Sequence, residues 1–206
     1  AQHSTAIPYL MQHLQAVQTR AYFTSSGSFY KIDQEGGIVR LHENDDQEER
    51  PLQLLAHEEF CLLLYASKLL VYRHDTLLQT IKAPWQESFV LVALGATNLA
   101  CALASGPIQI RVNQIGIWRS NGASQKPITR KLRWHSQAAT CLEFDGDTLY
   151  SGGIEAVLVV WEITGSTLAP ELTLPRLAQD ALYGIHSNQH IMLHSRDNTL
   201  QVYTKH

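Results

Sequence analysis

Glu155–Trp161, with the sequence EAVLVVW, and Asp197–Tyr203, with the sequence DNTLQVY, contain the most informative pattern in this chain. The two stretches align without gaps, and each has an acid six residues before an aromatic residue. Short runs of β-branched and apolar side chains between turn residues are typical of strands. We expect the acid to lie in the tight turn between the second and third strands of a sheet, and the aromatic residue to end the third strand.

Similar short runs occur along the whole chain, and period-2 alternation dominates over helical periodicity. Strands that end in an aromatic residue are expected at Tyr72, Trp118, Trp161 and Tyr203, at intervals of 46, 43 and 42 residues. The full set of expected strands is Gly37–His42, Phe60–Tyr65, Lys68–Tyr72, Phe89–Leu94, Leu99–Ala104, Ile115–Trp118, Thr140–Phe144, Val157–Trp161, Ala181–His186, His190–His194 and Thr199–Tyr203.

A period of 40 to 45 residues with four strands per unit is typical of the blades of a WD-repeat β-propeller. The sequence therefore predicts an all-β fold, a partial WD-repeat β-propeller of about four to five consecutive four-stranded blades. The predicted blades cover residues 1–48, 49–82, 83–126, 127–169 and 170–206. We expect the last blade to lack its fourth strand after His206 and the chain, which begins with Ala1 rather than Met, to be a piece of a longer protein.

The spacing also predicts a buried polar network within one blade. His135 precedes Trp161 by 26 residues, which places it in the loop before the first strand of that blade. Together with Ser151 and Glu155 it is expected to pin the strands through hydrogen bonds. Asp197 is the expected counterpart of Glu155 in the next blade. We assign these five residues a structural role rather than a functional one.

The composition indicates a globular protein, because 45% of the residues are hydrophobic and only 17% are charged. No apolar run is long enough to suggest a membrane span or a membrane partner. The three cysteines, Cys61, Cys101 and Cys141, stand among apolar neighbours and are interpreted as reduced, buried thiols.

The net charge of −3 hides an uneven distribution. Residues 33–59 contain nine acids and two bases, whereas residues 88–142 contain no acid at all. This uneven distribution of charge favours an anionic partner on one side of the protein. The alternative is that the two stretches are solvated loops whose charges only keep the chain soluble. Trp134 follows the cations and is expected to pack between blades. The candidate contacts for RNA or an acidic partner are Arg119, Lys126, Arg130, Lys131 and Arg133.

Motifs for catalysis or cofactor binding are weak or missing. The stretch His57–Cys61 begins like the zinc-protease motif but has Cys in place of the second His, in a strand-like context. His186, His190 and His194 recur every four residues, but in a strand–turn–strand arrangement only the first two are expected to meet. Phosphate-binding glycine loops and the serine-hydrolase elbow do not occur in the sequence. We therefore predict no enzyme activity, no catalytic residues, no cofactor, no metal and no small-molecule substrate.

One segment, from Trp118 to Tyr203, resembles a particular WD-repeat family. It contains Leu132-Arg-Trp-His135, then Ser151–Trp161 (SGGIEAVLVVW), Leu174-Pro-Arg-Leu177 and Ser195-Arg-Asp-Asn198 in order. This order is similar to that of the nucleolar WD-repeat proteins of the transcription-linked U-three protein subcomplex of the small-subunit processome. The resemblance implies a scaffold in the nucleolus for ribosome biogenesis and pre-rRNA processing, with other propellers and helical domains as partners and pre-ribosomal RNA as a candidate one. The alternative is a generic WD-repeat interaction module, such as a substrate adaptor or a trafficking platform.

Overall fold

The computed structural model of the chain describes residues 12–17, 20–43, 49–57, 60–95, 98–112, 128–163, 172–174 and 180–205. Within strands, residues 109–112, 128–130 and 172–174 are described by their backbone alone. The described residues form nineteen β-strands and no helix, and so include no helix long and apolar enough to cross a membrane. The chain divides into two compact units, Ala1–Trp85 and Gln86–His206.

The first unit contains two four-stranded antiparallel sheets in which the strands follow chain order. The first sheet consists of β1 (His13–Val17), β2 (Arg20–Ser25), β3 (Ser28–Ile32) and β4 (Ile38–His42). The second sheet consists of β5 (Gln53–His57), β6 (Phe60–Leu64), β7 (Lys68–Arg73) and β8 (Thr76–Lys82).

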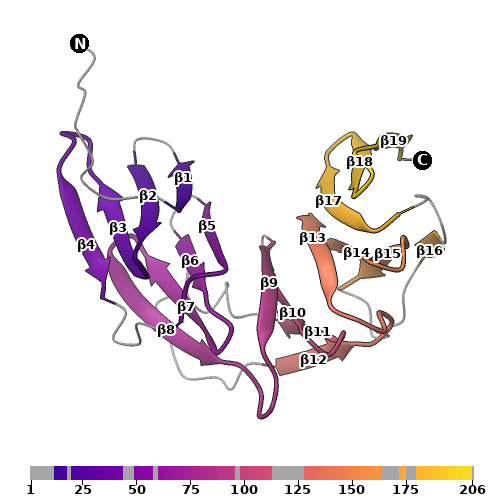
Figure 1. Cartoon of the computed structure of the whole chain (residues 1–206), viewed down its shortest axis with the longest axis horizontal. Helices are drawn as coiled ribbons and strands as arrows, with labels where there is room; N and C mark the ends of the chain where they lie inside the picture. The colour runs from indigo at the N-terminus through magenta and orange to yellow at the C-terminus, as the bar shows by residue number, and fades with distance from the viewer. Residues whose placement is uncertain are drawn as a thin grey trace. The chain divides into compact units, whose positions relative to one another are not determined.

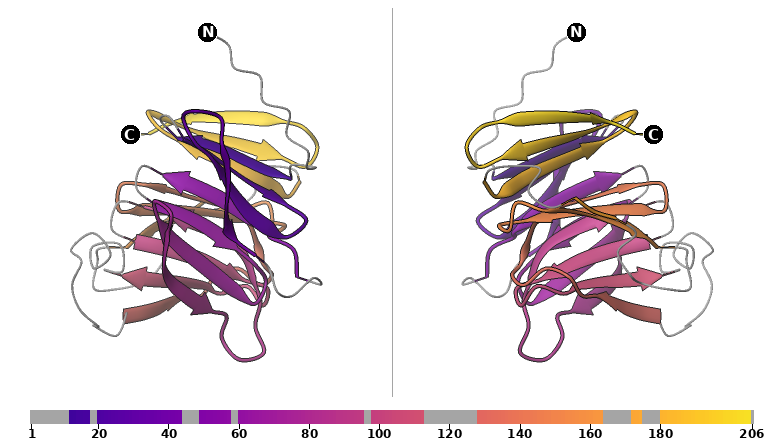
Figure 2. Two further views of the ribbon diagram at one scale, coloured as in Figure 1. Left: turned by 90° about the vertical axis from the view of Figure 1, so that its left-hand side faces the viewer. Right: turned by 90° about the vertical axis from the view of Figure 1, so that its right-hand side faces the viewer.

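The second unit contains three more sheets with the same order (Figure 1). The third sheet consists of β9 (Phe89–Leu94), β10 (Asn98–Leu103), β11 (Ile108–Val112) and β12 (Ile128–Leu132). The fourth consists of β13 (Ala139–Asp145), β14 (Thr148–Gly153), β15 (Leu158–Glu162) and β16 (Leu172–Leu174). The fifth, drawn in yellow in Figure 2, has three strands in the described residues, β17 (Leu182–Ser187), β18 (His190–Ser195) and β19 (Leu200–Thr204).

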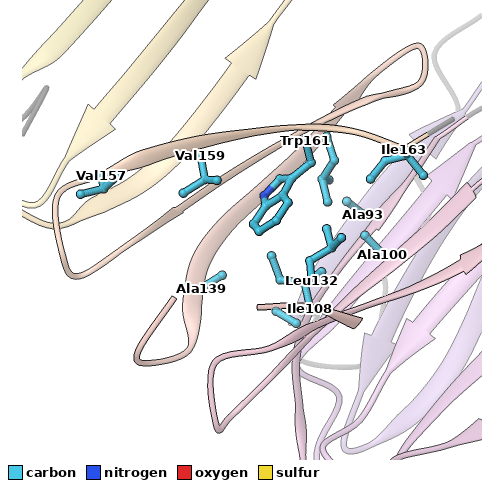
Figure 3. Close-up of a cluster of buried hydrophobic side chains, with 11 residues drawn as sticks. Ala93, Ala100, Ile108, Leu132, Ala139, Val157, Val159, Trp161 and Ile163 are labelled. Atoms are coloured by element: carbon cyan, nitrogen blue, oxygen red, sulfur yellow. The ribbon is translucent and has the colours of Figure 1, made fainter. Parts of the chain in front are cut away.

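Within each unit, neighbouring sheets touch through their first strands. β1 contacts β5 in the first unit, and β13 contacts both β9 and β17 in the second. The faces of successive sheets then pack on one another, because apolar side chains cover them. Trp161 of the fourth sheet lies against Ile108 and Leu132 of the third in one such layer (Figure 3). This arrangement buries both faces of the fourth sheet, and Leu158, Val159 and Trp161 of its third strand are almost fully inaccessible to solvent.

The predicted all-β architecture is confirmed, and ten of the eleven expected strands overlap strands of the structure. The eleventh, Ile115–Trp118, lies outside the described residues. Sequence reasoning missed β1, β2, β3, β5, β8, β11, β12, β14 and β16. Two of these strands, β1 and β8, are exposed for most of their length and therefore lack the apolar runs by which strands are recognised.

The third sheet differs from the repeat that the aromatic residues suggested. Its third strand is β11, in which Arg111 pairs with Leu99 as Trp161 pairs with Leu149 in the fourth sheet. Arg111 therefore occupies the aromatic position, and the assignment of that position to Trp118 was wrong. The equivalent positions in the five sheets are Ile32, Tyr72, Arg111, Trp161 and Tyr203.

The sheets of the structure begin and end at different residues from some of the predicted blades, whose boundaries lie at residues 48, 82, 126 and 169. The second sheet ends at Lys82, but β12 belongs to the third sheet although the prediction assigned residues 127–132 to the fourth blade. Likewise β16 pairs with β15 beyond residue 169. In both cases the fourth strand follows its sheet after a long intervening segment, and the sequence pattern does not show to which sheet it returns.

Candidate functional site

The fourth sheet holds a chain of buried polar side chains between its strands. The indole Nε1–H of Trp161 donates to Ser151 Oγ at 2.8 Å, and Ser151 Oγ lies 2.8 Å from His135 Nε2. An indole N–H can only donate, so the Ser151 hydroxyl accepts it and is free to give its own hydrogen to His135. This assignment leaves Nδ1 of His135 protonated and directed toward Glu155 Oε2, 3.5 Å away.

Glu155 fixes the outer end of this network. Its side chain leaves the turn between β14 and β15, and Oε1 accepts hydrogen bonds of 2.9 Å from both the backbone N–H and the hydroxyl of Ser136. Gly153 makes the approach possible, because a Cβ at that position would lie 2.4 Å from Glu155 Oε2 and 3.2 Å from His135 Nδ1. The loop before β13 is thereby fastened to the turn after β14.

The surroundings set the charge states of the two titratable groups in opposite senses. Burial lowers the pKa of His135 from its ordinary value, although the Glu155 carboxylate opposes this effect. Desolvation by itself would raise the pKa of Glu155. Hydrogen bonds from its own backbone N–H and from Ser136, together with nearby His135, hold the pKa of Glu155 below its usual range. The network is therefore built for a neutral imidazole and an ionised carboxylate.

Stability should consequently fall with acidification in two stages. An unfolded His135 takes up a proton as the pH falls through about 6.5, whereas the folded one resists, so unfolding becomes easier below that pH. Unfolded Glu155 takes up its proton near pH 4.3 and adds a second loss at lower pH. We expect the melting temperature, followed by circular dichroism, to decline from about pH 7 toward pH 5 and again below about pH 4.5.

His135→Asn should remove the first stage of this decline, and His190→Asn, at an exposed histidine, should keep it. An unchanged pH profile in His135→Asn would contradict the assignment of the buried neutral imidazole.

Asp197 occupies the same turn position as Glu155 but does not build the same network. Its Oδ1 caps its own turn, accepting from the backbone N–H of Thr199 at 3.0 Å and from the Thr199 hydroxyl at 2.7 Å. In the fifth sheet, Leu193 stands where the fourth has Ser151, since Leu193 pairs with Gln201 as Ser151 pairs with Val159. The structure thus brings together His135, Ser151, Glu155 and Trp161 and leaves Asp197 apart.

A related contact recurs in four sheets and was not predicted. In each, a carboxylate joins the loop before the first strand to the turn between the second and third strands; we call this contact the turn clamp. The four clamps are Glu49 with Ser67, Glu87 with Ser105, Glu155 with Ser136, and Asp180 with Arg196. In the first two pairs the glutamate precedes the serine by 18 residues, and the second pair follows the first by 38 residues. This repeated spacing is the sequence pattern from which the clamps could have been predicted. The clamps hold these loops and turns in fixed positions.

Ser151, His135 and Glu155 contact one another in the same order as the serine, histidine and acid of a serine-hydrolase triad. Their burial, however, favours a structural role. Ser151 is fully buried, and its oxygen already accepts the indole N–H of Trp161. A nucleophile must reach a substrate carbonyl, and this hydroxyl has no surface exposed to solvent or substrate. The arrangement is suited to holding a loop in place.

The candidate cations are only partly within the described residues. Arg119 and Lys126 lie outside them, and Arg130 is described by its backbone in β12. Lys131 and Arg133 are exposed at the end of β12 and in the loop that follows. Trp134 is more exposed than predicted, with 38% of its surface accessible, and its ring stands nearly perpendicular to the His135 ring, with 5.4 Å between the ring centroids. It therefore faces solvent rather than being enclosed between sheets.

The histidines and cysteines give no sign of a metal centre in the part of the chain that is described. The register of β17 and β18 places His186 opposite Met192, with His190 and His194 on the same strand as Met192. His186 instead lies 3.1 Å from Glu143 of β13, and no group of three or more potential ligands is close enough to hold a metal among the described residues. Cys61, Cys101 and Cys141 are buried and form no disulfide, and burial raises the pKa of Cys141 to about 12.

Comparison with solved structures identifies the fold. The chain is similar to a chain of the mitotic checkpoint complex, with 16% identity and a TM-score of 0.72, covering 90% of this chain and 57% of that one. It is similar to the WD40 β-propeller domain of Doa1, with 14% identity and a TM-score of 0.68, covering 94% of this chain and 63% of that one. The computationally designed Ika8 protein, at 16% identity and a TM-score of 0.72, is matched over 95% of this chain and 58% of its own.

These likenesses show a WD40 β-propeller fold, and the chain spans about three fifths of the length of each of these structures. No family model matches the sequence, and no curated protein is significantly similar to it.

Proposed function

We propose that this protein is a non-enzymatic scaffold that binds other macromolecules through the loops and turns held by the turn clamps. The observation that carries this proposal is the pair Arg133 and Trp134, which stands exposed on a loop fixed from below by His135 and Glu155. Arginine and tryptophan supply a large share of the binding energy in protein interfaces, and a rigid loop loses little entropy when it binds.

The more specific proposal is a role in the early assembly of the small ribosomal subunit, with residence in the nucleolus. It is supported by the family resemblance of the segment from Trp118 to Tyr203 and by the absence of acids from residues 88–142. On this proposal, the partners are other processome proteins, both propellers and helical domains. Pre-ribosomal RNA is a further candidate partner within the same processome.

Affinity purification of the full-length protein from growing cells tests both levels of the proposal. The expected result is co-purification of pre-ribosomal RNA and small-subunit processome proteins, together with nucleolar fluorescence of a tagged copy. A stable set of other partners outside the nucleolus would remove the ribosomal role and leave a generic interaction module. Recovery of the protein alone, across several lysis conditions, would contradict the scaffold function itself.

A further inference from the structure

The loop end of the fourth sheet carries an exposed apolar pair beside exposed cations. Ile154, in the turn between β14 and β15, is 43% exposed, and Trp134 is 38% exposed. The two are linked through His135, whose ring meets Trp134 and whose Nδ1 lies next to Gly153, the residue before Ile154. We call Lys131, Arg133, Trp134 and Ile154 the Trp134 surface.

The backbone beneath this surface is held more firmly than that of an ordinary loop. Ser136 donates two hydrogen bonds to Glu155, and the Gln137 backbone N–H reaches the same carboxylate oxygen at 3.3 Å. On the other side, the turn at Gly106 packs directly beneath the His135 carbonyl. The exposed side chains therefore project from a fixed frame, which lowers the entropic cost of binding.

The charges at this end of the second unit distinguish between two classes of anionic partner. Lys131 and Arg133 have no ion pair in the described part of the chain, so both cations are available to a partner. Carboxylates also stand at the same end, since Glu87 and Glu155 form the turn clamps of the third and fourth sheets. A nucleic acid presents a phosphate at every step and would meet these carboxylates, whereas a peptide can place its acids selectively.

We propose that the Trp134 surface binds a short acidic peptide segment of a partner protein, with an apolar side chain seated between Trp134 and Ile154. A carboxylate of the peptide pairs with Arg133, whose planar guanidinium suits a bidentate contact, and a second meets Lys131. This inference rests on the proposed scaffold function and names the kind of partner for one of its surfaces.

The test uses the whole chain and an array of short synthetic peptides that combine glutamates with one or two leucine or phenylalanine residues. The expected result is selective binding of these peptides over matched peptides with lysine in place of glutamate. Trp134→Ala and Arg133→Glu should each weaken binding by about tenfold or more. Trp85→Ala, at a tryptophan that is 88% exposed, and Lys82→Glu, at an exposed lysine, are the matched controls and should bind as the unmodified chain does.

Circular dichroism melts show whether each variant remains folded, and an oligouridine of similar length serves as the nucleic-acid probe. Peptide binding that is equal in Trp134→Ala and Trp85→Ala would overturn the proposal, as would the absence of binding to every acidic peptide. Binding of oligouridine with loss in Arg133→Glu, and no peptide binding, would assign the surface to RNA instead. If partners still co-purify from cells with the Arg133→Glu protein, the scaffold function stands and only this surface is excluded.

Discussion

Replacing Trp161 with alanine should lower the free energy of unfolding by about 3–5 kcal/mol, because a large buried aromatic side chain leaves a cavity. Trp161 is 1% exposed and packs in a cluster with Ile108 and Leu132 of the third sheet and Val159 of its own (Figure 3). Its removal therefore loosens the contact between two sheets as well as one strand. Urea unfolding followed by far-ultraviolet circular dichroism measures the effect.

Trp161→Phe separates the apolar part of this effect from the polar part. Phenylalanine keeps most of the packing but cannot donate to Ser151, whose buried hydroxyl loses a partner at 2.8 Å. An unmet buried hydrogen bond costs about 1–3 kcal/mol, so the phenylalanine variant should fall between the unmodified chain and Trp161→Ala.

The matched control is Trp134→Ala, because Trp134 is 38% exposed and leaves no enclosed cavity. It should cost less than about 1 kcal/mol, as surface substitutions usually do. A loss in Trp161→Ala no larger than in Trp134→Ala would mean that the fourth sheet is not packed as described.

The spacing of polar and aromatic residues was sufficient to locate the network of the fourth sheet. His135, Ser151, Glu155 and Trp161 are of the residue types that can donate and accept in series, and their separations match one blade. The same reasoning failed for Asp197, because it aligned only the acid and the aromatic residue of the two sheets. It did not compare the second-strand position that Ser151 occupies in the fourth sheet and Leu193 in the fifth. Leu193 there has no hydroxyl, and the chain of hydrogen bonds cannot form.

The repeat was harder to recognise in the sheets whose third strand has no aromatic residue at the equivalent position. Ile32 and Arg111 stand at the position that Tyr72, Trp161 and Tyr203 fill with an aromatic ring. A search for aromatic residues therefore did not find this position in the first sheet. In the third sheet it predicted the third strand at Trp118 instead of at β11. Strand pairing depends on the backbone and on burial of whole faces, so the sheet forms even where the marker is absent.

The turn clamps show a different limit of sequence reasoning. A glutamate and a serine 18 residues apart have no recognisable pattern until the strands place them at one end of a sheet. The roles are also exchanged between sheets: the carboxylate comes from the loop in the second and third sheets and from the turn in the fourth. The contact is repeated while the residue types are not.

The last large effect is expected at Gly106, in the turn between β10 and β11. Its φ of +110° lies in a region that residues with a side chain rarely adopt, and a Cβ there would lie 2.6 Å from the His135 carbonyl oxygen. Both obstacles are in the backbone, which cannot move aside as a flexible side chain can. Gly106→Ala should therefore lower the free energy of unfolding by about 2–5 kcal/mol, from strain and overpacking together.

Gly146 provides a control with a positive φ and no close contact. It also has a positive φ, of +59°, but a Cβ added there would have nothing within 4 Å. Gly146→Ala should thus cost only the backbone preference, about 1 kcal/mol, in the same urea titration. The excess loss in Gly106→Ala combines the less accessible φ at Gly106 with the contact between the turn of the third sheet and the loop that carries Arg133 and Trp134. Equal losses in the two variants would show that this turn does not support the loop, and the rigid frame of the Trp134 surface would then depend on the Glu155 clamp alone.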